Sequence, residues 1–356
     1  MVPALYPHDG RPDGRAVVMS LSLFFGLCRL TIHSTNEGLL DRLARDFSYF
    51  AAPRVKPSDY VTIRAELREP DWSVIRGRYL FTHFNGRAYG WGDRRWVRYA
   101  ESLVAYDAAA NQGSVTSPDE ELLYHYTYYL MIALVGKQLD AHGFHRFHAL
   151  GVSVTGQAAL FSMPISGGKT TLGLTLMEDP AVSLYSEDTP LIDSRGLVHP
   201  FAPRLSLRDG HGAGIPERWI RIKSDPVFGR KTLVDVDYYG QHRVAATPGQ
   251  SPLVFWSIKS TQGKPSVRAM HPLRSLVWLV YYIVIGKDCP QRAEVLLRFS
   301  PGGIRMIAGL FFRRLVAAVQ LWRNSRSYRF YMTRDVPANA AFIKDFIREN
   351  TRSGRA

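Results

Sequence analysis

Met163-Pro-Ile-Ser-Gly167-Gly168-Lys169-Thr170-Thr171 follows a strand-like apolar run at 158–163 and opens a helical run at 169–177. A phosphate-binding loop requires this context, because small residues let backbone N–H groups converge on phosphate oxygens at a helix N-terminus. Lys169 can reach β- and γ-phosphates, and the Thr170 hydroxyl can bind Mg²⁺. The stretch therefore predicts a nucleotide site within an α/β fold.

The loop departs from the usual phosphate-binding pattern at one position. Met163 stands where the pattern has its first glycine. Without that glycine, the remaining residues also fit an ordinary glycine-rich turn between a strand and a helix. The loop by itself leaves both alternatives open, and the next strand along the chain bears on the choice.

An acidic pair, Glu187-Asp188, follows the next strand-like run, at 181–185. In phosphate-loop enzymes a carboxylate at the end of a neighbouring strand holds Mg²⁺. A second, adjacent carboxylate can take a proton from an attacking hydroxyl group. Solvated acidic pairs are common at strand ends, but the position of this pair after the loop favours a role in phosphate chemistry.

These motifs together resemble the HPr kinase/phosphorylase family, and more closely its stand-alone HPr-kinase-like relatives. The resemblance is good over 148–209 and loose over 141–335. It implies a P-loop kinase domain with a fold shared with phosphoenolpyruvate carboxykinases, ATP and Mg²⁺ as cofactors, and phosphate transfer as the activity. The matching residues are His148, the loop at 163–171, Leu184-Tyr-Ser-Glu187-Asp188-Thr-Pro-Leu-Ile-Asp193 and Pro200-Phe-Ala-Pro-Arg204.

The resemblance also implies a role for each matching residue. Glu187 occupies the position of the general base on the acceptor hydroxyl. Asp188 and Thr170 occupy the positions of metal ligands. His148 matches a histidine close to the acidic pair, and Lys169 matches the lysine of the phosphate loop, so both are predicted catalytic residues. The nucleotide contacts are assigned to Ser166, Gly167, Gly168, Lys169, Thr170, Thr171 and Arg204.

The chain departs from the family in ways that bear on its substrate. Glu187 stands where the family usually has Asp, which moves the base by one methylene, and Met163 alters the loop. The chain has no good copy of the signature by which HPr kinases recognise HPr. We therefore expect the acceptor to be a serine of another protein or of a ribosomally made peptide precursor. Lys231 is a weaker candidate, like Arg204, for a contact to phosphate or acceptor.

The sequence predicts four segments. Residues 1–18 are expected to be a disordered leader, with Met1 and Met19 both open as the start. Residues 19–140 are expected to form a smaller N-terminal α+β domain, and residues 141–335 the nucleotide-binding domain. A C-terminal helix and tail are expected at 336–356. Within these segments the patterning predicts a strand at 24–32 and helices at 36–50, 118–139, 273–285, 304–322 and 337–350.

Composition excludes several classes of protein. The chain has 356 residues, of which 46% are hydrophobic and 21% charged, as in globular proteins. Cys28 and Cys289 are far apart in sequence, which rules out a disulfide scaffold and a cysteine-based zinc site. A reducing, cytoplasmic compartment is expected. The longest strictly apolar run, 276–285, has ten residues, whereas a spanning helix needs about 20, so no transmembrane segment is expected.

The charge balance favours an anionic partner. The net charge is +14, of which +8 lies between Gly303 and the C-terminus (11 basic and three acidic residues). This tail is equally consistent with a solvated basic helix. A non-catalytic nucleotide sensor, favoured by Met163, remains an alternative to the kinase. A basic binder of nucleic acid or of a membrane surface is a third class, although no specific nucleic acid is expected, and homo-oligomerisation is left open.

Overall fold

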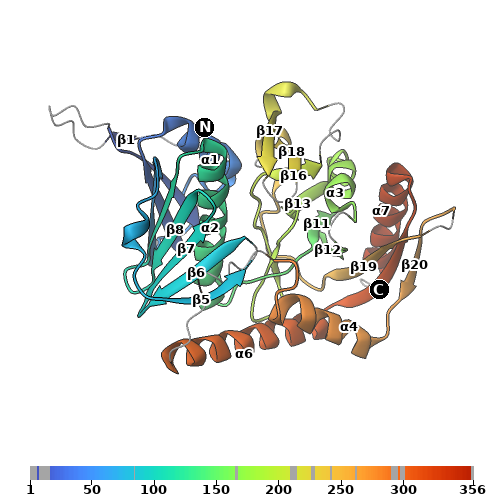
Figure 1. Ribbon diagram of the computed structural model, residues 1–356. Helices are drawn as coiled ribbons and strands as arrows, with labels where there is room; N and C mark the ends of the chain where they lie inside the picture. The colour runs from blue at the N-terminus through green and yellow to red at the C-terminus, as the bar shows by residue number, and fades with distance from the viewer. Residues whose placement is uncertain are drawn as a thin grey trace. The chain divides into compact units, whose positions relative to one another are not determined.

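The computed structural model describes residues 6–7, 17–83, 85–164, 167–208, 215–225, 229–240, 243–260, 263–289, 296 and 301–353 (Figure 1). The chain divides into two units. Unit 1 contains residues 1–139, 222–231 and 290–307, and unit 2 contains residues 140–221, 232–289 and 308–356. The first change of unit lies beside the boundary expected at 140. Two stretches of the expected 141–335 domain belong to unit 1, and the expected C-terminal segment belongs to unit 2.

Unit 1 is built on one mixed sheet. In the described part of the unit its nine strands follow the order β1-β2-β3-β4-β9-β8-β7-β6-β5. β3, β4 and β9 run parallel to one another, and the other pairs are antiparallel. The strands are β1 (Tyr6–Pro7), β2 (Met19–Phe25), β3 (Cys28–Ser34), β4 (Asp59–Leu67), β5 (Arg78–His83), β6 (Gly86–Trp91), β7 (Arg94–Tyr99), β8 (Ser102–Asp107) and β9 (Gln112–Ser117).

The helices of unit 1 begin at side-chain caps. α1 (Glu37–Asp46) starts after Asn36, whose Oδ1 accepts a hydrogen bond from the Leu39 N–H at 2.8 Å. α2 (Glu120–Ala141) starts after Asp119, whose carboxylate accepts from the Leu122 N–H at 2.8 Å. The helix predicted at 36–50 is shorter in the structure. It ends at Asp46 and is followed by a 3₁₀ turn at Ser48–Phe50.

The single strand predicted at 24–32 is instead the end of β2, a two-residue turn and most of β3. β2 and β3 pair antiparallel, with Phe25 opposite Cys28. Gly26 lies at the turn with φ +60°, a left-handed conformation that glycine adopts without steric cost. The apolar run continues through the turn, so hydrophobic patterning did not reveal it. Tyr6–Pro7 pairs with β2 as β1, whereas the rest of the leader predicted to be disordered lies outside the described residues, except for residues 17 and 18.

Unit 2 is built on a sheet of six strands among the described residues, in the order β13-β11-β12-β19-β21-β20. β12, β19 and β21 are parallel, and β11 is antiparallel to both of its neighbours, β12 and β13. β12 and β13 therefore point the same way. The strands are β11 (Leu150–Val154), β12 (Gln157–Ser162), β13 (Val182–Ser186), β19 (Leu253–Lys259), β20 (Ser266–Ala269) and β21 (Arg326–Met332).

Helices cover both faces of this sheet, which explains why its central strands are apolar on both sides. Alternate residues of a strand point to opposite faces. Phe161 stacks on Phe255 with ring centroids 4.8 Å apart, and Phe255 contacts Phe346 of α7 (Val336–Ser353). Leu160 and Val254, the preceding residue of each strand, pack instead into a core shared with α4 (Pro272–Leu279) and α6 (Pro301–Asn324).

The remaining elements are short. α3 (Lys169–Met177) lies beside α7 in unit 2 (Figure 1). A π-helix at Val280–Val284 continues α4, so the helix predicted at 273–285 changes its winding halfway along. Two small sheets follow the orders β10-β14-β15 and β16-β18-β17. Their strands are β10 (His145–Arg146), β14 (Leu191–Ile192), β15 (Val198–His199), β16 (Leu205–Arg208), β17 (Ile220–Asp225) and β18 (Gly229–Val234).

The mixed α and β composition expected from the sequence is confirmed. No helix in the part of the chain that the structure describes is long and apolar enough to cross a membrane.

Candidate functional site

The candidate site lies at one edge of the six-stranded sheet of unit 2. β12 ends at Ser162 and leads through the glycine loop into α3, and β13 ends at Ser186 directly before Glu187 and Asp188. Because β12 and β13 point the same way, their carboxyl ends meet at the same edge. This topology brings the loop lysine and the acidic pair together. We call His148, Lys169, Thr170, Glu187 and Asp188 the site cluster.

Lys169 is the centre of the site cluster. Its side chain is buried, and its Nζ lies 2.5 Å from His148 Nε2 and 3.3 Å from Asp188 Oδ1. Burial lowers the pKa of His148, although Asp188 opposes this shift, so a neutral imidazole is favoured. A neutral ring that accepts from Lys169 at Nε2 carries its proton at Nδ1. That atom lies 3.2 Å from Asp188 Oδ1, outside hydrogen-bonding geometry.

Glu187 and Thr170 form the second half of the cluster. The Thr170 hydroxyl donates to Glu187 Oε1 and also lies 3.2 Å from the carbonyl oxygen of Ser206. Burial, followed by repulsion from Asp188, raises the pKa of Glu187 from 4.5 to about 7. The hydrogen bond from Thr170 and the charges of Lys169 and Arg204 oppose that shift. A carboxyl group that titrates near neutral pH is suited to proton transfer.

The loop residues that the structure describes have the conformation of a tight turn. Gly168 has φ +100° and precedes the first residue of α3, and no side chain of the described residues caps that helix. The Gly167 N–H donates to the carbonyl oxygen of Pro164 at 2.8 Å. A Cβ on Gly167 would lie 2.8 Å from that oxygen and 3.0 Å from the Met163 side chain, so a larger residue does not fit there. Met163 itself is buried against Gly167.

The other predicted site residues differ in how they relate to the cluster. Arg204 is buried, and its charge acts on Glu187. Thr171 lies in the first turn of α3 and is half-buried. Ser166 lies outside the described residues. Lys231 lies on β18, in unit 1, whereas the site cluster belongs to unit 2.

The oxygen atoms of Thr170 and Asp188 are suited to bind a Mg²⁺ ion that also contacts phosphate. Thr170 offers a hydroxyl oxygen and Asp188 a carboxylate whose side chain is 43% exposed. Mg²⁺ prefers such hard oxygen ligands and usually takes only one or two carboxylates, with phosphates and water completing its shell. The described residues contain no group of three or more His, Cys, Asp or Glu that could hold a metal by themselves.

Sequence reasoning missed two contributors. The Ser206 carbonyl is a backbone group, which no residue pattern reveals. Asp288 acts electrostatically on His148 and pairs with Lys287 at 2.6 Å. Its φ of +64° lies in the left-handed region, which Asp adopts more readily than most residues other than glycine. The turn 286–289 is short and polar, but nothing in its sequence indicated a position near the site.

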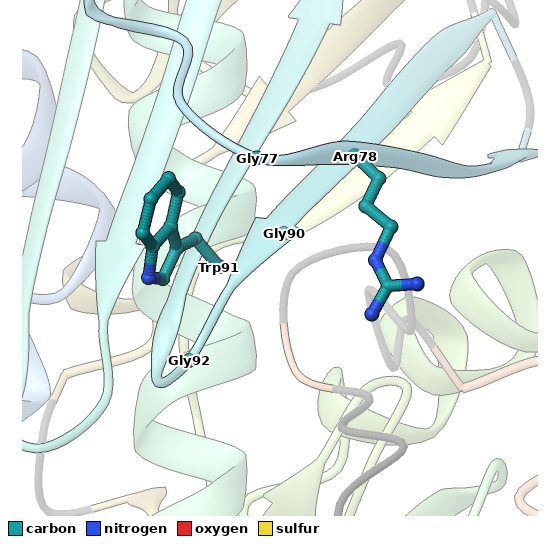
Figure 2. A pocket seen from close by; sticks show the side chains of 5 residues that line it. All are labelled: Gly77, Arg78, Gly90, Trp91 and Gly92. Atoms are coloured by element: carbon teal, nitrogen blue, oxygen red, sulfur yellow. The ribbon is translucent and has the colours of Figure 1, made fainter.

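A hollow of about 680 Å³ in unit 1 is a separate feature (Figure 2). It is lined by Gly77, Arg78, Gly90, Trp91 and Gly92, and the side chains of Trp91 and Arg78 extend away from one another. None of the predicted site residues that the structure describes is among these lining residues. Arg78 is the one ionisable side chain among these five residues, whereas the site cluster brings together a lysine, a histidine and two carboxylates.

Neither any protein-family model nor any curated protein matches this chain.

Proposed function

We propose that the protein is an ATP-dependent phosphotransferase that moves the γ-phosphate of Mg·ATP to a hydroxyl group. We infer that the acceptor is a serine of a protein or of a ribosomally made peptide precursor. The observation that carries the proposal is the convergence of Lys169, Asp188 and the Thr170–Glu187 pair at the N-terminus of α3. A cation, a metal ligand and a general base are the parts that phosphate transfer requires.

Each residue has a role that follows from its surroundings. The open N–H groups of the first turn of α3 and the Lys169 ammonium group attract phosphate oxygens. Thr170 and Asp188 would hold Mg²⁺ through their oxygen atoms, and the bound ion would supply positive charge at the transferring phosphate. Glu187 accepts the proton of the acceptor hydroxyl group. The oxygen of that hydroxyl group forms the new bond to phosphorus. ADP is the leaving group, so one P–O bond forms and one breaks.

His148 has a positioning role in this proposal. In the structure it holds the Lys169 amine at 2.5 Å, and a bound phosphate would compete for the same amine. The imidazole fixes where that amine lies before nucleotide binds, and Asp188 lies within 3.3 Å of both groups. The same carboxylate therefore links the lysine, the histidine and the metal position.

Transfer of labelled γ-phosphate from Mg·ATP into a size-fractionated host extract tests the proposal. We expect label in a protein or peptide fraction with the wild-type chain. Lys169→Ala should lose at least about 100-fold in rate, because a preorganised charge at a reacting phosphate is worth several kcal/mol. Glu187→Gln should bind ATP but should not transfer the γ-phosphate to the acceptor. Thr175→Ala, further along α3, is the matched control and should retain activity.

Retention of full activity in Lys169→Ala would contradict the proposal. A second function, a nucleotide sensor without turnover, is favoured by Met163, whose buried side chain lies beside Gly167 in place of the usual first glycine. Mg·ATP binding that Lys169→Ala abolishes, combined with no label in any fraction, would favour the sensor. Met163→Gly would then be the variant to compare with the wild type.

A further inference from the structure

α4 and the π-helix that continues it expose a line of apolar side chains. Leu273, Val277, Tyr281 and Ile285 recur every four residues, which places them on one face of the helical segment. Their exposed fractions lie between 42% and 67%. Leu279, on another face of the same segment, is fully buried in the core of unit 2. Apolar residues that are exposed singly are ordinary, whereas a continuous line of them marks a contact surface.

The part of α6 in unit 2 has a second exposed apolar face. Phe311, Phe312 and Leu315 are exposed, and Phe312 has an exposed fraction of 68%. Ala318 and Leu321, further along the helix, are buried in the core that also contains residues of α4. Because both helices bury one side in the same core, their exposed sides point away from it. We call the exposed apolar residues of the two helices the α4–α6 face.

The two helices are direct neighbours. The Trp322 Nε1–H of α6 donates to the carbonyl oxygen of Pro272, the first residue of α4, at 3.0 Å. Figure 1 shows α4 beside the C-terminal end of α6. The apolar lines of the two helices therefore belong to one region of unit 2.

The charged side chains of α4 and α6 all have the same sign. Neither α4 nor α6 contains an Asp or Glu. Arg274, Arg313 and Arg323 are exposed and have no ion-pair partner among the residues the structure describes. Leu, Ile and aromatic residues combined with unpaired arginines are typical of helices that lie in the headgroup region of a membrane.

We propose that the α4–α6 face docks on the surface of an anionic lipid bilayer. The apolar side chains would enter the boundary between headgroups and acyl chains, and the arginines would contact lipid phosphates. A second copy of the chain is a poorer occupant, since a symmetric contact would place two acid-free, arginine-bearing faces together. Nucleic acid is also a poorer occupant, because exposed Leu, Val and Ile side chains gain nothing from a phosphate backbone. The proposal is independent of the proposed kinase activity.

Co-sedimentation of the full chain with vesicles tests the proposal. We expect binding to vesicles of phosphatidylcholine with phosphatidylglycerol, at least about tenfold tighter than to pure phosphatidylcholine and weakened by added salt. Replacing both Phe311 and Phe312 with Ser should weaken binding at least about tenfold, because burial of each ring is lost. Arg313→Gln should weaken it roughly fivefold.

Trp91→Ser in unit 1 is the matched control, because Trp91 is as exposed as Phe312 but lies outside the α4–α6 face. It should bind anionic vesicles like the wild type. Far-UV circular dichroism checks that each variant is folded. A second measurement is the quenching of tryptophan fluorescence by brominated phosphatidylglycerol, which leaves the apolar line unchanged. The quenching should be lost in Trp278→Phe if Trp278 is the residue that contacts the lipid.

Three outcomes would overturn the proposal. The first is absence of binding to anionic vesicles. The second is unchanged binding by the Phe311→Ser/Phe312→Ser variant. The third is a dimer of the wild-type chain in solution that this double variant converts to a monomer, together with no vesicle binding, which would assign the face to a second copy.

Discussion

Unit 2 contains two clusters of acidic and basic side chains, and the pKa of a carboxyl group is shifted in opposite directions in the two clusters. The first is the site cluster, at the edge of the sheet. The second is a buried ion cluster of Asp140, His145 and Arg314. Arg314 donates to both carboxylate oxygens of Asp140, at 2.6 and 3.1 Å, and His145 Nδ1 lies 2.7 Å from the same carboxylate.

The pKa shifts differ in direction. Burial alone would raise the pKa of Asp140, but the hydrogen bond with His145 and the Arg314 guanidinium hold it below its ordinary value. In the site cluster, burial and repulsion from Asp188 prevail, and the pKa of Glu187 is raised. The comparison teaches that the composition of a charged cluster does not decide its role. A carboxylate with both oxygens paired stabilises the fold, whereas an underpaired acid beside a second carboxylate remains available for chemistry.

The largest expected effect is on the buried ion cluster. Arg314→Met leaves the Asp140 carboxylate buried without its cationic partner, which should lower the free energy of unfolding by about 3–5 kcal/mol. Denaturant titration measures the change. Arg313→Met, at the neighbouring exposed position, is the control and should change stability by less than about 0.5 kcal/mol. Equal effects in the two variants would show that the pair with Asp140 does not stabilise the fold.

The second effect concerns the pH dependence of phosphate transfer. A general base must be ionised, so kcat/KM should fall as pH drops below the raised pKa of Glu187, by roughly 50-fold between pH 7 and pH 5. Asp188→Asn removes the repulsion that contributes to the shift, so the midpoint of its weaker profile should move to lower pH. A flat profile between those pH values would exclude Glu187 as the base.

The third effect tests the same group through stability. The folded state binds the Glu187 proton more tightly than the unfolded state, since the pKa is about 7 rather than 4.5. The free energy of unfolding should therefore decrease as pH rises from 4.5 to 7. Glu187→Gln removes this dependence, so it should be more stable than the wild type by roughly 2 kcal/mol near pH 8, with the difference vanishing at low pH. A variant less stable at every pH would contradict the raised pKa.

The smallest effect concerns the glycine loop. Gly168→Ala should cost about 1 kcal/mol of stability, because φ is +100° at this position. The added Cβ would meet no atom within 4 Å, so the cost is in the backbone alone. Gly309→Ala in α6 is the matched control. It also has open space, lies within a helix and should stabilise the chain by up to about 1 kcal/mol. Thermal unfolding of both variants should give shifts of opposite sign.

The sequence predicted features that depend on neighbouring residues. The helix at 118–139 and the order strand, glycine loop and α3 agree with the structure, because periodicity, caps and glycines act over a few residues. The hairpin at Gly26 was missed, because apolar residues continue through the turn. The change from α4 to a π-helix was also missed, since an apolar run of this kind is compatible with either winding.

Within the candidate site, the residue types came from the sequence and the pairings from the fold. Lys169 was recognised from the glycine-rich motif, and the acidic pair from its position after the next predicted strand. β11 lies between β12 and β13 in the sheet, and this arrangement aligns the carboxyl ends of β12 and β13. It depends on pairing between strands that are distant in the sequence. The pairing of Asp140 with Arg314, 174 residues apart, had no sequence signal at all.

By itself, the sequence determined where a phosphate loop could form, which side chains could do its chemistry, and that the C-terminal part carries excess positive charge. Only the tertiary structure decided that Lys169 contacts His148 and Asp188, that half-buried Glu187 lies beside Asp188 so that its pKa rises, and that the apolar lines of α4 and α6 are exposed. The physical reason is range. Backbone preferences and caps act over a few residues, whereas burial and electrostatic coupling depend on segments that only folding brings together.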